Sequence, residues 1–361
     1  MKSESSVVFV TVSMGGGGTE RVISILANKY CEMGIPVTIL MIAGEQVAYE
    51  LDNRIQLINV SGATGGSLIG RIKRVTKLRT FFKENKDAKI IAMGTVAAMF
   101  ALLSKVGLPN KMVVSERNDP NRLNHRPIRF TEKALRNLLY YGAAQLVLQT
   151  EDVKKCFPQA LIRKSIVIPN PISESLPDTS VSNNREKTVI TAGRLTEQKN
   201  HRLLIDSFKE FEETHSGYRL HIFGDGELKD SLQEYIISSG LQNKACLEGF
   251  TSDLYSELQK GGMYVSSSNW EGISNSLVEA LAMGIPTIAT DCPMGGSRMF
   301  IENMENGLLV SINDKNALVK AMSYIADHDD LVKTMSEKAM KIREILAVER
   351  IAKQWLELFD R

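Results

Sequence analysis

The chain has 361 residues, of which 43% are hydrophobic and 24% charged, a composition typical of soluble globular proteins and unlike that of a fibre or a disordered chain. A chain of this length exceeds the size at which a single hydrophobic core keeps growing, so we expect two domains. Its four cysteines are widely scattered, with no C-x-x-C pair, and its five histidines are dispersed. Neither a disulfide framework nor a metal centre is therefore predicted.

The two halves of the chain carry opposite charge. Residues 1–170 contain 24 Lys and Arg against 13 Asp and Glu, a net +11, and residues 171–361 contain 20 against 29, a net −9. The opposite charges of the two halves affect which charged partners each domain attracts. Aromatic residues make up only 6% and do not interleave with the cations, so no nucleic acid partner is expected.

Short apolar runs alternate with helical patterns along the chain. Strands are predicted at 7–12, 37–42, 89–93, 111–115 and 145–148, and again at 188–192, 219–223, 263–266 and 286–290. This repeat is typical of an α/β protein with two separate sheets. The first run is too short to span a bilayer, and the residues before it make a poor signal peptide, so we expect a cytoplasmic protein.

Four glycines, Gly15, Gly16, Gly17 and Gly18, follow the first predicted strand and precede a helix expected from about residue 19. Such a run lets the backbone approach a ligand closely. A nicotinamide-binding loop is the rival interpretation, but Glu20 stands where the third glycine of that motif is expected, and the lysine of a P-loop is missing.

The segment 68–82 combines an apolar stripe with a basic face. Leu68, Ile72, Val75, Leu78 and Phe82 recur at helical spacing, and Arg and Lys residues fill the other side. Two interpretations stay open: the helix lies on an anionic membrane surface, or it packs its stripe on the first sheet as an ordinary surface helix.

A polar cluster follows the fourth predicted strand. Glu116, Arg117 and Asn118 lie in the loop after it, with Asp119 and Arg122 as weaker candidates, and loops at strand ends often carry function. Arg117 could contact a sugar, bind a phosphate, or form a structural ion pair with Glu116 or Asp119.

The boundary between the two domains is predicted at 169/170, because Pro169 and Pro171 flank Asn170 and interrupt both helix and strand. A polar stretch, 173–186, follows it. Near the C-terminus apolar residues return at helical spacing, which indicates an amphipathic terminal helix.

Two cations follow the first strand of the second domain. That strand breaks at Gly193, and Arg194 and Lys199 precede a helix expected from about residue 201. Ligands of open α/β sheets bind beyond the carboxyl ends of the strands, and an Arg fork with a Lys point charge could neutralise a diphosphate. An isolated pair of this spacing is common on solvated surfaces. Gly224 opens a Gly-Asp-Gly-Glu-Leu segment, whose simplest interpretation is a turn with Asp225 as the cap.

Glu271 and Glu279 bracket a predicted helix start that follows the strand at 263–266. The free N–H groups and positive dipole of such a start suit a phosphate-bearing ligand, and the two carboxylates could contact different parts of one nucleotide-sized molecule. Alternatively, Ser276 and Glu279 form a capping box, in which the glutamate only satisfies a backbone N–H group.

Taken in order, Gly193-Arg-Leu…Lys199-Asn200, Gly224-Asp-Gly-Glu-Leu228 and the Glu-x7-Glu segment 271–279 resemble the C-terminal domain of glycosyltransferase family 4. The likeness to these retaining enzymes of bacterial capsule, exopolysaccharide and O-antigen synthesis runs from about residue 7 to the C-terminus. It implies the GT-B fold, with two Rossmann-like domains whose parallel sheets face a central cleft. The acceptor-binding domain would be 1–169 with a crossover helix at 347–361, and the donor-binding domain 170–346.

The resemblance also implies metal-independent, retaining transfer of a hexose or N-acetylhexosamine from a UDP-sugar, with no cofactor. The acceptor would be a saccharide on a polyprenyl diphosphate at the cytoplasmic face of the membrane, to which the 68–82 helix would attach. The alternatives are the same donor chemistry on a soluble acceptor and a non-catalytic module that binds nucleotide sugars.

Residue by residue, the resemblance assigns catalysis to Arg194, Lys199 and Glu271. Glu271 would hold a sugar hydroxyl and Glu279 the ribose hydroxyls. The donor would contact the catalytic three and Gly16, Gly17, Gly193, Gly224, Gly272, Ile273, Ser274 and Glu279, while the acceptor or sugar side would involve Gly15, Gly18, Glu116, Arg117 and Asn118. Many family members have a histidine near the position of Arg117, so this chain departs from the pattern there.

Overall fold

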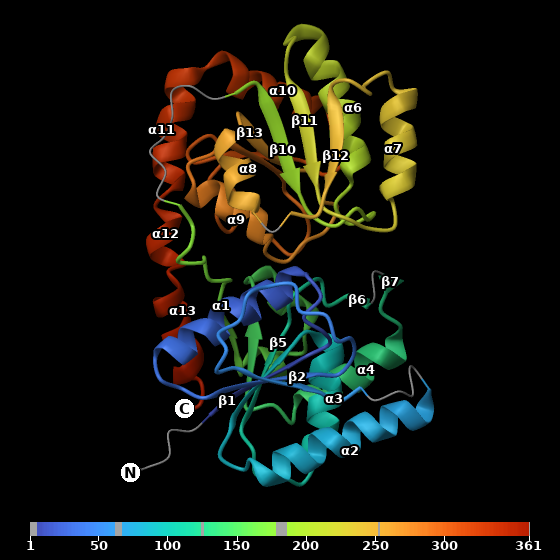
Figure 1. The fold of residues 1–361 in the computed structure, drawn as a ribbon, viewed down its shortest axis with the longest axis vertical. Helices are drawn as coiled ribbons and strands as arrows, with labels where there is room; N and C mark the ends of the chain where they lie inside the picture. Colours follow the sequence, from blue (N-terminus) through green and yellow to red (C-terminus); the bar gives the residue numbers. More distant parts are fainter. Residues whose placement is uncertain (1–5, 62–66, 124–125, 178–185, 252, 361) are drawn as a thin grey trace. The chain divides into compact units, whose positions relative to one another are not determined.

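The computed structural model describes residues 6–61, 67–123, 126–177, 186–251 and 253–360. The chain divides into two compact units, which we call unit 1 (residues 1–173 and 346–361) and unit 2 (residues 174–345) (Figure 1). Each unit is a parallel sheet with helices packed on it. Most of the predicted polar stretch, 178–185, and the last residue of the predicted crossover helix lie outside the described residues.

Unit 1 contains a seven-stranded parallel sheet. Its strand order is β3-β2-β1-β4-β5-β8-β9, with β1 Val7–Thr11, β2 Val37–Met41, β3 Gln56–Asn59, β4 Lys89–Met93, β5 Met112–Ser115, β8 Gln145–Leu148 and β9 Ser165–Val167. The five predicted strands are confirmed. They are nearly continuous apolar runs, because helices cover both faces of a parallel sheet. The sequence missed β3 and β9, which are short, lie at the two edges and are only partly buried.

The unit 1 helices are α1 Gly18–Glu32, α2 Leu68–Glu84, α3 Thr95–Lys105, α4 Phe130–Tyr140, α5 Gln159–Ile162 and α13 Val348–Glu357, with a 3-10 helix at Asp152–Cys156 and a small hairpin of β6 Arg122–Leu123 and β7 Arg126–Pro127. The C-terminal helix α13 packs on α1. The Tyr30 hydroxyl donates a hydrogen bond to the Ala352 carbonyl at 3.1 Å, and Trp355 is fully buried. Residues from the two ends of the chain thus share one core.

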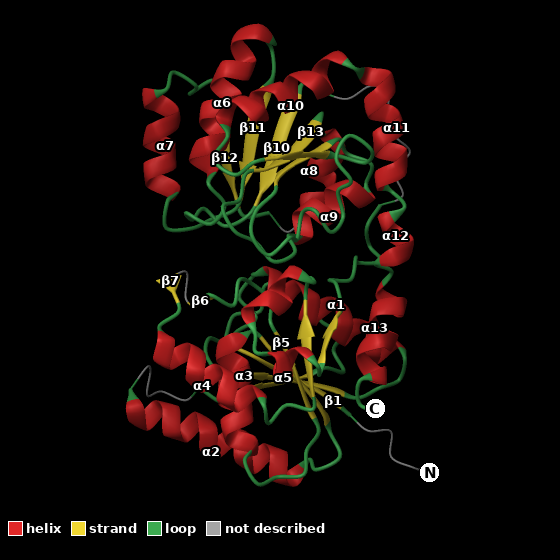
Figure 2. Ribbon diagram, turned by 180° about the vertical axis from the view of Figure 1, so that it is seen from behind, coloured by secondary structure: helices red, strands yellow, loops and turns green. Residues whose placement is uncertain are grey.

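Helix α2 divides its predicted apolar stripe between two environments. Its C-terminal half buries Leu78 and Phe82, as an ordinary surface helix does. Its N-terminal half leaves Leu68 and Ile72 exposed, at 73% and 58%. Helix α3 contacts both α2 and α4, and the three helices lie side by side in Figures 1 and 2.

Unit 2 contains a six-stranded parallel sheet in the order β12-β11-β10-β13-β14-β15. The strands are β10 Thr188–Ala192, β11 Arg219–Phe223, β12 Ala245–Gly249, β13 Met263–Ser266, β14 Thr287–Thr290 and β15 Leu308–Val310. The four predicted strands are confirmed, and the edge strands β12 and β15 were missed. Strand order reverses between β10 and β13, and ligands of open α/β sheets bind at such a switch point, beyond the carboxyl ends of the strands.

Helices cover both faces of this second sheet. They are α6 His201–Thr214, α7 Lys229–Ser238, α8 Leu254–Lys260, α9 Asn275–Ala282, α10 Lys315–Asp327, α11 Asp329–Ala339 and α12 Ile342–Ile345. Helices α6 and α10 pack together on one face, and α8 and α9 lie on the other (Figures 1 and 2). The core beneath α6 and α10 contains Phe208, Phe211, Leu220 and Met322, and it includes Val189 of β10 and Val265 of β13.

Candidate functional site

The loop after β10 is held by the glycine-rich turn after β11. Gly224 has a φ of +137°, and a Cβ atom there would lie 2.0 Å from the Gly193 carbonyl oxygen, so only glycine fits. The backbone N–H of Leu195 donates to the Asp225 carbonyl at 3.0 Å, and the N–H of Leu228 donates to the Leu195 carbonyl at 3.0 Å. The Gly-Asp-Gly-Glu-Leu segment is therefore a turn, as predicted, and it also fixes the loop that carries Arg194. The prediction that Asp225 is the cap is wrong, because Leu228 is the N-cap of α7 and the Asp225 carboxylate accepts a hydrogen bond from the Gly226 N–H at 2.8 Å.

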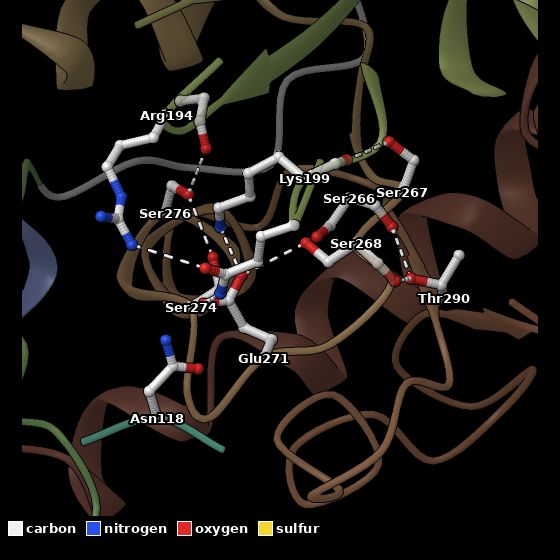
Figure 3. Close-up of polar contacts among 12 residues, drawn as sticks. Asn118, Arg194, Lys199, Ser266, Ser267, Ser268, Glu271, Ser274, Ser276 and Thr290 are labelled. Carbon is white, nitrogen blue, oxygen red and sulfur yellow. Dashed lines mark hydrogen bonds and ion pairs between the residues drawn. The ribbon is translucent and has the colours of Figure 1, made fainter. Parts of the chain in front are cut away.

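Lys199 lies directly over Gly193 and reaches Glu271. A Cβ atom on Gly193 would stand 2.7 Å from the Lys199 Cε atom. The Lys199 ammonium forms an ion pair with the Glu271 carboxylate, with 2.5 Å between Nζ and Oε2, and the two side chains are only 14% and 15% exposed (Figure 3). Burial alone would lower the pKa of Lys199, but the Glu271 carboxylate raises it above its usual value.

Glu271 is the centre of a polar network at the ends of β10 and β13. Its Oε1 atom accepts a hydrogen bond from the Gln198 amide at 3.1 Å, and its Oε2 atom accepts one from the Ser268 hydroxyl at 3.2 Å. The Arg194 guanidinium donates to the Gln198 side-chain oxygen at 3.4 Å. The structure thus brings Arg194, Lys199 and Glu271 together. Lys199 contacts Glu271 directly, and Gln198, which was not predicted from the sequence, links Arg194 to Glu271.

Helix α9 does not begin with the alternative capping box. Its N-cap is Ser274, whose side chain makes no capping hydrogen bond, so Ser276 already lies in the first turn. The Ser276 hydroxyl donates to the Ala192 carbonyl at 2.9 Å and pairs with the Tyr264 hydroxyl at 2.7 Å. The capping-box interpretation is therefore wrong, because Ser276 ties α9 to the end of β10 instead.

Glu279 lies inside α9, away from solvent. Its side chain is 3% exposed, and the Tyr255 hydroxyl of α8 donates to its Oε1 atom at 3.4 Å. A ligand that binds the Oε1 atom of this carboxylate would have to displace the Tyr255 hydroxyl.

The loop after β14 was missed by the sequence analysis. A Cβ atom on Gly296 would lie 1.5 Å from the Gly272 carbonyl oxygen, so the two backbones are in direct contact. The Gly295-Gly296 pair after a predicted strand was the signal that could have indicated this loop. In the same loop Cys292 is buried, and burial, followed by the Glu271 charge, raises the pKa of its thiol to about 12. The thiol is therefore neutral near pH 7.

His201, the first residue of α6, was also missed. Burial, with the nearby Lys199 charge, lowers its pKa to about 4, so the imidazole is neutral at pH 7. Its Nε2 atom lies 3.3 Å from the Arg194 carbonyl oxygen. His201 therefore helps to hold the loop between Gly193 and Lys199.

The glycine run in unit 1 carries its own carboxylate. Gly15 and Gly18 are exposed, Gly17 is the N-cap of α1, and Gly16 has a φ of +104°. The Glu20 side chain folds back so far that a Cβ atom on Gly17 would lie 2.3 Å from its Oε2 atom. An anion approaching this helix start would meet the carboxylate as well as the N–H groups.

In the polar cluster after β5, the Glu116 side chain faces the interior, whereas the Asn118 side chain bonds within its own loop. Glu116 is 2% exposed and accepts hydrogen bonds from the Tyr140 hydroxyl and, at 2.9 Å, from Thr95, and burial raises its pKa. Its carboxyl therefore faces the interior, which corrects the expectation that it contacts a substrate. The Asn118 side chain accepts a hydrogen bond from the Asp119 backbone N–H at 2.9 Å.

Arg117 forms neither of the ion pairs considered from the sequence. Glu116 is engaged in the interior, and Asp119 pairs with Arg122 at 3.8 Å. The Arg117 guanidinium donates instead to the Asn170 side-chain oxygen at 2.5 Å.

Two properties of the described residues bear on the kind of site. No three His, Cys, Asp or Glu side chains among them gather closely enough to hold a metal ion. None of the helices in the described part of the chain has the length and apolar character needed to cross a bilayer.

Comparison with known proteins adds a family match in unit 2. Residues 173–342 match the family of glycosyl transferases group 1. Over nearly its whole length the chain is similar to the GalNAc-alpha-(1->4)-GalNAc-alpha-(1->3)-diNAcBac-PP-undecaprenol alpha-1,4-N-acetyl-D-galactosaminyltransferase of Campylobacter jejuni, with 24% identity over 360 residues, 98% of this chain and 97% of the relative. It is equally similar to the amylovoran biosynthesis glycosyltransferase AmsD of Erwinia amylovora, with 24% identity over 358 residues, 95% and 96% of the two chains. Among solved structures, HepE of Anabaena in complex with UDP and glucose superimposes with a TM-score of 0.83 at 18% identity, covering 99% of each chain.

Proposed function

We propose that this chain transfers a hexose or N-acetylhexosamine from a UDP-sugar to a lipid-linked saccharide. The chain is a GT-B glycosyltransferase that resembles bacterial exopolysaccharide and O-antigen enzymes. The proposed transfer retains the anomeric configuration and needs no metal, as in family 4. One observation carries the donor half of the proposal: the ion pair of Lys199 with Glu271, beside Arg194, at the switch point of the unit 2 sheet.

The donor diphosphate takes the place that Glu271 now has on Lys199. A diphosphate carries more negative charge than one carboxylate, so the Lys199 ammonium and the Arg194 fork bind it in preference. Both cations then neutralise the charge that develops on the departing UDP, which is where electrostatic stabilisation lowers the barrier most. The departing phosphate accepts the proton of the acceptor hydroxyl, so no separate carboxylate base is needed.

Glu271, released from Lys199, is free to accept a hydrogen bond from a sugar hydroxyl. The backbone N–H groups from Gly272 to Ser274 and the start of α9 lie next to it in the chain and suit an anionic group. Glu279 binds the ribose hydroxyls after the Tyr255 hydroxyl has moved away. Gly193 and Gly224 have no side chains, so Gly224 leaves space for the Gly193 carbonyl and Gly193 leaves the space that the Lys199 side chain needs to cross the loop.

The acceptor side of the proposal rests on unit 1. The Campylobacter relative is named for a saccharide on diphospho-undecaprenol, and we extend that acceptor class to this chain. Gly15 and Gly18 are exposed, and we propose that the acceptor saccharide lies against them. The net charge of +11 on residues 1–170 favours an acceptor that carries phosphate.

We also propose that α2 attaches the protein peripherally to the cytoplasmic face of the membrane. Leu68, Ile69 and Ile72 are exposed next to the exposed cations Arg71 and Lys73, a combination that binds anionic lipid surfaces. The neighbouring α4 adds exposed Phe130 and Leu138, and α3 adds Leu103.

Liposome flotation tests this attachment. Ile72→Asp should reduce binding to vesicles that contain an anionic phospholipid, because it places a charge in the apolar patch. Thr80→Asp, which adds the same charge to an exposed position of the same helix about two turns away from Ile72, should reduce it much less. If the wild type does not bind such vesicles, this part of the proposal fails and the alternative of a soluble acceptor is favoured.

A thermal-shift screen of nucleotide sugars, followed by a transfer assay, tests the function itself. Only ligands that favour the native state raise the melting temperature, so UDP-sugars should do so and sugars without a nucleotide should not. The ligand that stabilises the protein should then be consumed with a polyprenyl diphosphate saccharide as acceptor. Stabilisation without turnover would indicate a non-catalytic binding module and contradict the proposed reaction.

A further inference from the structure

Three neighbouring strands of unit 1 deliver polar side chains to one point. Arg117 follows β5, Gln149 directly follows β8, and Asn170 follows β9, and these strands are adjacent in the sheet. The Asn170 side-chain oxygen accepts hydrogen bonds from Arg117 at 2.5 Å and from Gln149 at 2.9 Å. Ser115 adds a hydroxyl at 3.4 Å from the Arg117 guanidinium. The cluster therefore lies at the carboxyl edge of the sheet, where α/β proteins bind ligands.

The positive charge in this cluster has no counter-charge in the described protein. Glu116 is bound by Thr95 and Tyr140, and Asp119 pairs with Arg122. No described carboxylate forms an ion pair with Arg117, and its buried Nε atom has no hydrogen-bond partner. Burial alone lowers the pKa of this guanidinium, to about 10, but it remains charged at pH 7.

A purely structural role does not account for a cation at this position. The one strong contact of Arg117 is to a neutral amide oxygen, which a neutral donor could make as well. The Arg117 side chain is only partly exposed, and removing a charge even partly from water without a partner is unfavourable, so a bound anion would stabilise this arrangement. The planar guanidinium binds phosphate and carboxylate through two parallel hydrogen bonds.

We infer that Arg117, supported by Ser115 and Gln149, binds an oxyanion of the acceptor substrate. The oxyanion replaces the Asn170 side-chain oxygen on the guanidinium. It is either a phosphate of the lipid carrier or the carboxylate of an acidic sugar, since both present the same pair of oxygens. This inference rests on the proposed function, because it places the acceptor on unit 1.

Calorimetry on the full chain saturated with UDP tests the inference. UDP occupies Arg194 and Lys199 first, so a second anion reports on another site. Inorganic pyrophosphate and glucuronate are titrated separately, and the one that binds identifies the source of the oxyanion. Arg117→Gln should weaken that binding at least about tenfold. Arg126→Gln, which removes an equal charge from an arginine already paired with Glu132, should leave it within about twofold.

Two further readouts separate this role from a structural one. UDP affinity should be the same in Arg117→Gln as in the wild type. The melting temperature should be equal or higher, because the variant removes a charge that pairs with no described carboxylate, whereas a structural role would lower it. Should Arg117→Gln fail to fold, Arg117→Lys decides, because it keeps the charge but loses the fork and should bind roughly fivefold more weakly.

The inference is overturned if the wild type binds neither anion with UDP in place, or if the Arg117 variant that folds binds as tightly as the wild type. A protein that does not bind UDP at all speaks against the proposed function instead.

Discussion

Replacing Glu271 by glutamine removes the negative charge that holds Lys199 while keeping the size of the side chain. At the observed 2.5 Å and an effective dielectric constant near 20, the gross attraction is roughly 7 kcal/mol. Desolvation offsets most of it, and a hydrogen bond to a charged group contributes about 1.5–3 kcal/mol net. UDP must displace this contact before it can bind Lys199.

The variant should therefore bind UDP more tightly and unfold more easily. In the variant UDP no longer has to break the contact between Lys199 and Glu271. If about half of the net energy of that contact is gained in binding, the affinity for UDP rises roughly tenfold. The free protein should lose about 1.5–3 kcal/mol of stability, which lowers the melting temperature by several degrees, because each kcal/mol shifts it by about 2–4 °C in a domain of this size. Sugar transfer should fall sharply, since the amide no longer accepts the sugar hydroxyl as the carboxylate does.

Isothermal calorimetry with UDP and differential scanning calorimetry without it measure the two effects. Glu197→Gln is the matched control, because Glu197 is an exposed acid of the same loop and should leave both quantities unchanged. Unchanged or weaker UDP affinity in Glu271→Gln would refute the exchange of Lys199 between carboxylate and diphosphate.

Three further substitutions probe the supports of the network. Gly296→Ala places a methyl group 1.5 Å from the Gly272 carbonyl oxygen, so it should cost about 1–3 kcal/mol of stability and reduce transfer; wild-type melting temperature and activity would show that the contact is unimportant. Gly193→Ala displaces the Lys199 side chain, whose Cε atom would be 2.7 Å away, so calorimetry should show about tenfold weaker UDP binding, and equal affinity would contradict this. His201 has a folded-state pKa of about 4 and an unfolded value near 6.5, so the unfolded chain takes up the proton first. Its contribution is complete above about pH 6.5 and is lost as the pH falls towards 4, by about 3 kcal/mol. Urea unfolding of His201→Gln should show a smaller loss between pH 7 and pH 5 than the wild type, and an identical loss would exclude His201 as the cause.

The fold was predictable wherever a strand is buried on both faces. β4, β8, β10, β11 and β13 have the predicted bounds, because each is largely apolar and most of its residues are buried. The edge strands were missed for the opposite reason. β12 alternates between buried and exposed positions, and β15 has only three residues, so neither produces an apolar run long enough to recognise.

The site was predictable in its charges but not in its contacts. Sequence spacing indicated Arg194, Lys199 and Glu271 as separate signals, and the fold joins Lys199 to Glu271 directly. Their roles in binding UDP stay predictions. The supports at Gln198 and Gly296 were missed, because their partners lie far along the chain and only the folded sheet brings them together.

The same limit applies to Arg117. The sequence offered its neighbours Glu116 and Asp119 as partners, but alternation of side chains at the end of β5 sends Glu116 into the core. Asn170, which the sequence marked only as part of a domain boundary, is the residue that Arg117 contacts.

A crystal structure of the UDP complex tests the central claim most directly. The account predicts the Lys199 ammonium about 3 Å from a diphosphate oxygen, with Arg194 on the same group and the contact between Lys199 and Glu271 broken. A complex in which UDP is bound while Lys199 still holds Glu271 would contradict it.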